Sequence, residues 1–211
     1  MKKIFAILAI TILTVTACQK DKTVSHVVTV PTVKVNGDKF ITINVGGTMP
    51  EDAGATVIND EAISGGSNIM ASENNVDVNT PGIYYMLYQT QTKNGYTVGA
   101  ARYIAVTNYT DAEDLTGTYV RTANDLPVEL TRKSRALYEN NDMGGAGLSD
   151  AIYFAVINDS TIVAGPEYSE TLSTVIDTKN AELHIEPGNT YFQYILIAPG
   201  YGTPLRKFVK E

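Results

Sequence analysis

Apolar and polar residues alternate with period two along much of the chain after residue 26. Val33 and Val35 precede the tripeptide Asn36-Gly37-Asp38, and Ile41 and Ile43 resume the alternation after it. Such alternation places apolar side chains on one face of a half-buried strand, and Asn-Gly favours a tight turn. The pattern therefore predicts short, antiparallel strands.

A second pair of strand-like runs surrounds another Asn-Gly turn. Residues 76–88 and 96–106 are rich in β-branched and aromatic residues, and Lys93-Asn94-Gly95 lies between them. A type I′ turn needs positive φ at both central positions, which asparagine and glycine adopt most readily. These residues predict a β-hairpin.

Four features within residues 26–107 resemble bacterial immunoglobulin-like modules related to the Ig-like domain of pesticidal crystal proteins and to HYR repeats. They are Asp52-Ala53-Gly54-Ala55, the run from Val76 to Tyr88 with its central Pro81-Gly82-Ile83-Tyr84, the Asn94-Gly95 turn, and Arg102-Tyr103-Ile104-Ala105-Val106. The resemblance implies an Ig-like β-sandwich over 26–107. In that fold Tyr84 would form a tyrosine corner, and Met86 would fill the core position of an antibody disulfide cysteine.

A polar, acidic segment at 108–114 is predicted to link this sandwich to a second domain at 115–211. The second domain contains about eight short β-rich segments without a helical pattern, which predicts an antiparallel β-meander or barrel-like domain. Asn158-Asp159-Ser160 and Thr178-Lys179-Asn180 are expected to close tight hairpins. The opening Leu115-Thr116-Gly117-Thr118-Tyr119 resembles the C-terminal domain of small Bacteroidota lipoproteins of unknown function, often encoded with polysaccharide-utilisation systems. That resemblance implies no site residue.

The N-terminus resembles a bacterial lipoprotein signal peptide. Lys2 and Lys3 precede an apolar run over residues 4–15, and Leu13-Thr14-Val15-Thr16-Ala17-Cys18 has the form of a lipobox. The run is too short to span a membrane and fits a secretory signal. We predict a signal peptide over 1–17, lipidation of Cys18 and a tether over 18–25. The alternative is an ordinary cleaved signal with an incidental cysteine.

Lipidation implies an outer-membrane, lipid-anchored protein. In many Bacteroidota lipoproteins an acidic cluster after the cysteine marks export to the cell surface, but Asp21 alone is acidic here, between Lys20 and Lys22. The cell surface and the periplasmic face both remain open.

The chain is acidic, with 16 Lys and Arg against 23 Asp and Glu and a formal net charge of −7. Loss of Lys2 and Lys3 with the signal leaves 14 against 23, or −9. This charge argues against nucleic-acid binding, which needs a basic surface to neutralise phosphates. We expect attachment to the membrane through the lipid on Cys18 rather than through an amphipathic helix.

The sequence offers little for catalysis. Its two histidines are His26, at the tether, and His184, which alternation places with Glu182 and Glu186 on the polar side of a strand. There is no Gly-x-Ser-x-Gly nucleophile elbow, and no acidic pair has the context of a glycosidase cleft. We expect no enzymatic activity and no cofactor.

One loop has residue types that suit a calcium ion. Residues 139–150 are rich in glycine and include Asn140, Asp142 and Asp150, whose oxygens could coordinate a hard cation. The spacing differs from an EF-hand, and the same residues are those that turns require. We interpret the loop as a turn without a metal, and Asn140, Asp142 and Asp150 are weak calcium candidates.

Tyrosine is abundant, with 13 residues, and tryptophan is absent. In the second domain we expect most tyrosines to lie in the core with their hydroxyl groups at its edge. Tyr168 follows Gly165-Pro166-Glu167, and Tyr201 lies in Pro199-Gly200-Tyr201-Gly202, so both are predicted to be exposed. They are the candidate ligand-binding residues.

The preferred hypothesis is a lipid-anchored, non-catalytic accessory binding protein of the cell envelope, glycan-binding within a polysaccharide-utilisation system. The alternative is a structural or assembly lipoprotein that binds another envelope protein. Dense aromatic residues on one surface would favour a glycan, whereas a flat apolar patch or an unpaired strand would favour a protein partner.

Overall fold

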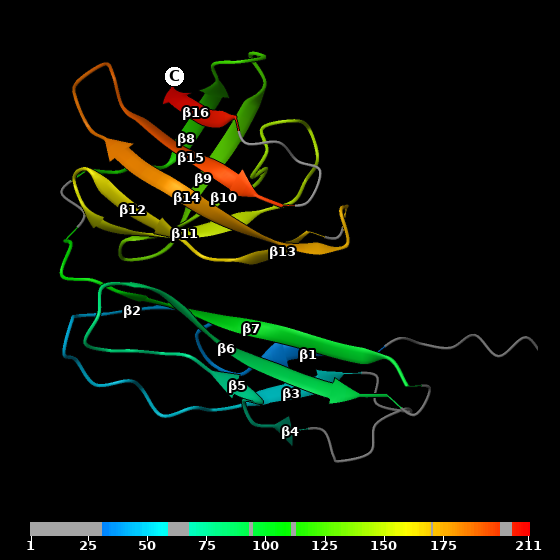
Figure 1. The fold of residues 1–211 in the computed structure, drawn as a ribbon. Helices are drawn as coiled ribbons and strands as arrows, with labels where there is room; N and C mark the ends of the chain where they lie inside the picture. The colour runs from blue at the N-terminus through cyan, green and yellow to red at the C-terminus, as the bar shows by residue number, and fades with distance from the viewer. Residues whose placement is uncertain (1–30, 59–67, 93–94, 111–112, 170, 199–203) are drawn as a thin grey trace, which may run out of the picture. The chain divides into compact units, whose positions relative to one another are not determined.

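The computed structural model describes residues 31–58, 68–92, 95–110, 113–169, 171–198 and 204–211. Within these ranges the chain forms strands and turns without a helix, so the predicted all-β fold is confirmed (Figure 1). No helix long and apolar enough to span a membrane occurs among these residues. Strands β1 to β7 form one module, and β8 to β16 form the second.

The first module has two sheets, with strand orders β1-β3-β4 and β2-β7-β6-β5. β6 and β7 form the predicted hairpin, paired from Gly82↔Val106 to Gln91↔Thr97, and β2 runs parallel to β7. Apolar residues of both sheets form one core. The strands are β1 (Thr32–Val35), β2 (Phe40–Ile43), β3 (Ala55–Ile58), β4 (Asn68–Ile69), β5 (Glu73–Asn74), β6 (Gly82–Gln91) and β7 (Thr97–Val106).

Two details of the predicted Ig-like fold are present on β6. The hydroxyl of Tyr84 donates a 2.8 Å hydrogen bond to the carbonyl of Thr80, four residues upstream, as a tyrosine corner does. Met86 is buried in the core. Both predictions are confirmed.

A partly buried ion pair links the segment before β3 to β7. Arg102 Nη1 lies 2.9 Å from Oδ1 of Asp52, which also accepts hydrogen bonds from the Tyr88 hydroxyl at 2.6 Å and the Gly54 amide at 3.0 Å. Burial opposes ionisation of Asp52, but these bonds and the Arg102 charge hold its pKa below the ordinary value. The Asp52 and Arg102 motifs of the Ig-like resemblance are therefore partners in one structural network.

The second module is an antiparallel barrel with one additional strand. Its strand order is β12-β11-β10-β9-β8-β16-β15-β14-β13, and the pair Thr161↔Glu182 between β12 and β14 closes the ring (Figure 1). The predicted barrel is confirmed. Its strands are β8 (Gly117–Arg121), β9 (Pro127–Ser134), β10 (Leu137–Asn140), β11 (Ile152–Asn158), β12 (Thr161–Ala164), β13 (Glu167–Ser169), β14 (Thr174–His184), β15 (Tyr191–Ile197) and β16 (Leu205–Lys210).

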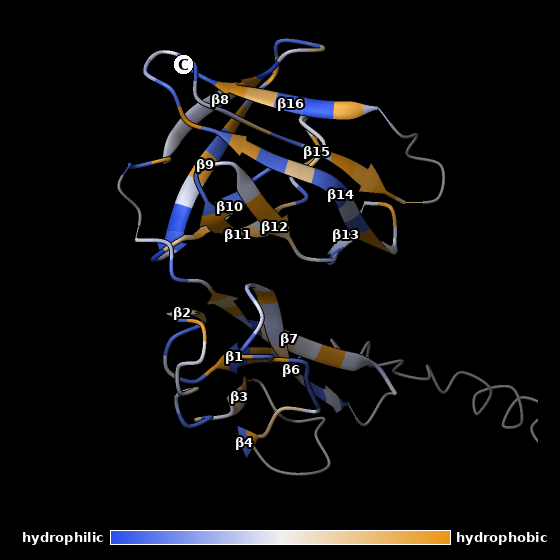
Figure 2. Cartoon of the chain, turned by 60° about the vertical axis from the view of Figure 1, so that its left-hand side comes forward, coloured by the Kyte–Doolittle hydropathy of each residue, from blue (hydrophilic) through white to orange (hydrophobic). Residues whose placement is uncertain are grey.

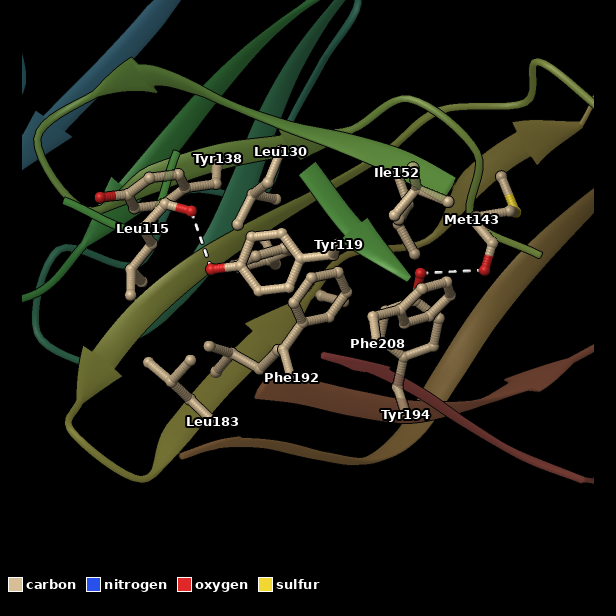
Figure 3. Close-up of a cluster of buried hydrophobic side chains, with 14 of the residues drawn as sticks. Leu115, Tyr119, Leu130, Tyr138, Met143, Ile152, Leu183, Phe192, Tyr194 and Phe208 are labelled. Carbon is tan, nitrogen blue, oxygen red and sulfur yellow. Dashed lines mark hydrogen bonds between the residues drawn. The ribbon is translucent and has the colours of Figure 1, made fainter. Parts of the chain in front are cut away.

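Aromatic rings fill the barrel interior (Figure 3). Phe192 lies 4.9 Å from Phe208 and 5.0 Å from Tyr119 between ring centroids. The hydroxyl of Tyr119 donates to the carbonyl of Leu115, and that of Tyr194 donates to the carbonyl of Met143 (Figure 3). Each buried hydroxyl therefore has an acceptor, so these tyrosines belong to the core.

The predicted hairpin at Thr178-Lys179-Asn180 is wrong. β14 continues through these residues as one strand, and its register against β15 shifts between Lys179 and Glu182. Asn180 has a φ of 53° at this irregularity. Asparagine tolerates positive φ in a β-bulge as well as in a turn, so a residue that is typical of turns lies here in a bulge within a strand.

Candidate functional site

Apolar side chains point outward from four adjacent strands of the barrel. Along β15 the even-numbered residues are buried, whereas Ile195 is half-buried and Ile197 is exposed. Tyr168 and Val175, on β13 and β14, are 61% and 58% exposed, and Leu205 at the start of β16 is also exposed. We call these five residues the apolar strip.

The strand register brings the members of the apolar strip together. Tyr168 lies directly opposite Val175, and Ile195 lies opposite Leu205. Ile197 lies opposite Asp177, two residues beyond Val175, so Ile197 and Val175 are diagonal neighbours at roughly 7–8 Å. In Figure 2 the end of β15 and the start of β16 carry the hydrophobic colour. The strip is therefore continuous across β13, β14, β15 and β16.

A hollow with a volume of about 370 Å³ adjoins the apolar strip at Asp177. Two sides of the hollow are formed by the end of β12 and by β14. A 3.1 Å hydrogen bond from the Thr178 hydroxyl on β14 to the carbonyl of Ala164 on β12 joins these two sides. The hollow is lined by apolar and polar groups of the barrel, among them Val163, Pro166, Asp177 and Lys179, and by Ile83 on β6 of the Ig-like module. The strip and the hollow share the outer face of β14, and together we call them the binding face.

The structure places one of the two predicted ligand-binding residues on this face. Tyr168 is exposed on β13 and belongs to the apolar strip. Tyr201 lies outside the described residues, in the segment 199–203 that connects β15 to β16, and Cys18 also lies outside them. Sequence reasoning missed Val175, Ile197 and Leu205, because their outward direction depends on the strand register of the barrel.

Other tyrosines of the barrel are unsuited to stack against a sugar ring. Tyr138 and Tyr194 are fully buried. Tyr191 is half-buried, and it stacks on His184 of β14 at 4.7 Å, while the Lys207 ammonium of β16 lies 3.6 Å from its ring centroid. Because β15 lies between β14 and β16, these neighbours cover Tyr191 from two sides. Among the described barrel tyrosines, Tyr168 alone is exposed.

The loop with the calcium candidates is held by its own hydrogen bonds. Asp142 is buried, and its two oxygens accept bonds from four backbone amides, those of Gly144, Ala146, Gly147 and Leu148. These bonds account for the glycine-rich sequence, since Gly145 and Gly147 both have positive φ.

The other two calcium candidates also have protein partners. Asn140 donates to the Tyr194 hydroxyl at 2.8 Å and accepts from the Asp142 amide, and Asp150 accepts from the Ser169 hydroxyl. No group of three or more His, Cys, Asp or Glu side chains in the described part of the chain is arranged to hold a metal ion. Asn140, Asp142 and Asp150 therefore each have hydrogen-bond partners within the protein.

His184 lies on the outer surface of β14 and pairs with Glu186 at 3.2 Å, as its alternating sequence predicts. Its ring stacks on Tyr191. His26, the second histidine, lies outside the described residues.

Comparison with known proteins supports the assignment of the first module as an Ig-like domain. Residues 33–106 match the family described as bacterial surface protein, Ig-like domain, which confirms the predicted Ig-like domain. The crystal structure of a lipoprotein from Bacteroides thetaiotaomicron is similar over 86% of this chain and 100% of that chain, with 20% identity and a TM-score of 0.39. No curated protein matches this chain.

Proposed function

We propose that the protein is a non-catalytic lipoprotein of the cell envelope that binds a protein partner through the binding face of its barrel. The single observation that carries this proposal is the apolar strip, in which Tyr168, Val175, Ile197 and Leu205 are exposed side by side. Isolated apolar residues on a surface need no explanation, but a contiguous group of them favours an interaction site.

The composition of the binding face resembles that of a protein interface. Aliphatic side chains and one tyrosine form its centre, and the charged groups of Asp177, Lys179 and Lys207 lie on the same outward-facing side of their strands. An apolar centre with a polar margin is typical of a protein–protein contact. A protein partner therefore fits better than a glycan, for which the described part of the barrel offers one exposed tyrosine ring.

The envelope location rests on two separate observations. The lipobox ending at Cys18 supports export and a lipid anchor, and the family that matches residues 33–106 consists of domains of bacterial surface proteins. The Ig-like module would then act as a spacer between the anchor and the barrel. Outer-membrane attachment is part of this proposal, and either leaflet agrees with it.

Photo-crosslinking in native envelopes tests the partner. A photoreactive phenylalanine analogue in place of Tyr168 should give one dominant crosslinked protein, and the same analogue in place of Thr131 should not. Thr131 is exposed on β9, four strands from β14 in either direction around the barrel, so it is a matched control.

Substitution at the strip tests whether the crosslink reports binding. The double variant Val175→Asp with Ile197→Asp should lower affinity for the captured partner at least about tenfold, because it buries two charges in the contact. Thr131→Asp should leave the affinity unchanged. Equal binding by both variants would refute the proposal.

A glycan remains the second candidate, favoured by the exposed ring of Tyr168. An array screen of residues 19–211 with Tyr168→Ala and Tyr201→Ala tests it directly. Specific glycan binding that either substitution weakens, together with no crosslinked protein, would replace the protein-partner function by glycan binding.

A further inference from the structure

One carboxyl group is buried where the barrel contacts the Ig-like module. Glu167 on β13 is 8% exposed, and its Oε2 accepts a 2.7 Å hydrogen bond from the Tyr103 hydroxyl on β7. Its second oxygen, Oε1, is buried and has no hydrogen-bond partner among the described residues. A buried carboxylate needs its charge compensated by hydrogen bonds or a cation, so this environment favours the neutral acid.

The surroundings of Glu167 are mainly apolar and aromatic. The ring of Tyr103 lies 4.3 Å from that of Tyr153 on β11 and 5.9 Å from that of Phe40 on β2, between centroids. These rings pack against a small cluster of fully buried residues from both modules: Ala105, Leu137 and Ala155. Water has little access to a charge placed here.

The charged groups near Glu167 come from three other segments of the chain. Lys39, just before β2, favours the ionised carboxylate, while Glu139 on β10 disfavours it. Lys133 on β9 forms a 3.0 Å ion pair with Glu139, so its charge is already engaged, and Tyr153 also bonds to Glu139. Burial is the largest influence on Glu167. It outweighs the hydrogen bonds from the Tyr103 hydroxyl and the Tyr153 backbone, both of which favour the carboxylate, and it raises the pKa of Glu167 to about 8.

We propose that Glu167 is a proton-dependent latch between the Ig-like module and the barrel: the neutral acid keeps Tyr103 packed against the barrel, and ionisation loosens the contact. Ionisation is unfavourable because Oε1 has no hydrogen-bond partner among the described residues. A negative charge on the carboxyl group would have to be hydrated, and the packed rings exclude water.

Hydrogen exchange of residues 19–211, which contain the whole compact unit from Pro31 to Glu211, tests the latch. Protection factors, corrected for the intrinsic effect of pH, are compared at about pH 6 and about pH 9, on either side of the Glu167 titration. In the wild-type protein the amides of Tyr103 and Ala155 should lose protection at least about tenfold at the higher pH.

Two variants decide whether Glu167 causes the change. Glu167→Gln cannot ionise but keeps an acceptor for Tyr103, so its protection should be the same at both pH values. Glu182→Gln, an exposed carboxyl on the outer face of β14, should behave like the wild type. The amide of Phe192 in the barrel core reports whether each variant is folded.

Two results would overturn the latch. One is unchanged wild-type protection at Tyr103 and Ala155 between the two pH values. The other is an equal pH-dependent loss in Glu167→Gln.

Discussion

Replacing Asp142 by alanine should destabilise the barrel, because this one side chain organises a whole loop. Its Oδ1 accepts the Gly144 amide at 3.0 Å, and its Oδ2 accepts the amides of Ala146 at 2.9 Å and Gly147 at 2.6 Å. The buried Gly144 amide left without an acceptor costs about 1–3 kcal/mol, whereas water replaces part of the loss at the exposed amides. We expect the free energy of unfolding to fall by about 2–4 kcal/mol.

Asp142→Asn refines this expectation. Its remaining oxygen can face the Ala146 and Gly147 amides, and the bond to Gly144 is then the one lost. The loss should therefore be about half that of the alanine variant. Urea unfolding of residues 19–211, followed by circular dichroism, measures both values. Asp159→Ala, exposed in the turn between β11 and β12, is the control and should stay within about 0.5 kcal/mol of the wild type.

A loss below about 0.5 kcal/mol in Asp142→Ala would refute this account of the loop. The same experiment tests the calcium candidates. Addition of about 1 mM calcium should leave the wild-type midpoint unchanged, because the Asp142 oxygens already bind amides. Stabilisation by calcium that Asp142→Ala abolishes would show that Asn140, Asp142 and Asp150 form a cation site after all.

Three further predictions concern stability and location. Because burial raises the pKa of Glu167 from 4.5 to about 8, the neutral acid stabilises the fold at low pH. This stabilisation should decline by about 4–5 kcal/mol in total as pH rises from about 4.5 to above 8, and Glu167→Gln should remove that slope in urea titrations. Arg102→Met leaves Asp52 without its cation in a mostly covered site, so it should cost about 3 kcal/mol or more by the same assay; a loss below about 1 kcal/mol would contradict the structural role of the pair. Cys18→Ala should move the protein from the detergent phase to the aqueous phase of a Triton extraction, and retention in the detergent phase would contradict lipidation.

The fold class could be predicted because its signals are local. Alternation and the Asn-Gly pair predict the β6–β7 hairpin, and the structure pairs these strands over their full length. The roles of Tyr84 and Met86 are implied by the Ig-like resemblance of the same strand, and the structure agrees with both. The hairpin predicted at Thr178-Lys179-Asn180 was wrong because asparagine adopts positive φ both in turns and in β-bulges. In the structure the positive φ of Asn180 belongs to a bulge in β14.

The binding face could be predicted only in part, because it is assembled from strands whose register the sequence does not reveal. The loop-like context of Tyr168 predicts its exposure, and Tyr168 is exposed in the structure. Val175, Ile195 and Leu205 each resemble ordinary strand residues, and they become neighbours only through the pairing of β13, β14, β15 and β16.

In β15, closure of the barrel determines which side chains are buried, and the sequence of the strand alone does not. Both of its faces carry apolar residues, a pattern typical of a strand that is buried on both sides. Closure of the ring through β12 and β14 leaves one inside, which Phe192, Tyr194 and Leu196 fill, and the remaining isoleucines must then face outward. Full coverage of both faces is usual for strands between two layers, but in the described part of the chain no second layer covers the exposed side chain of Ile197. An outer apolar surface that the described part of the fold leaves uncovered is the physical reason to expect a partner there.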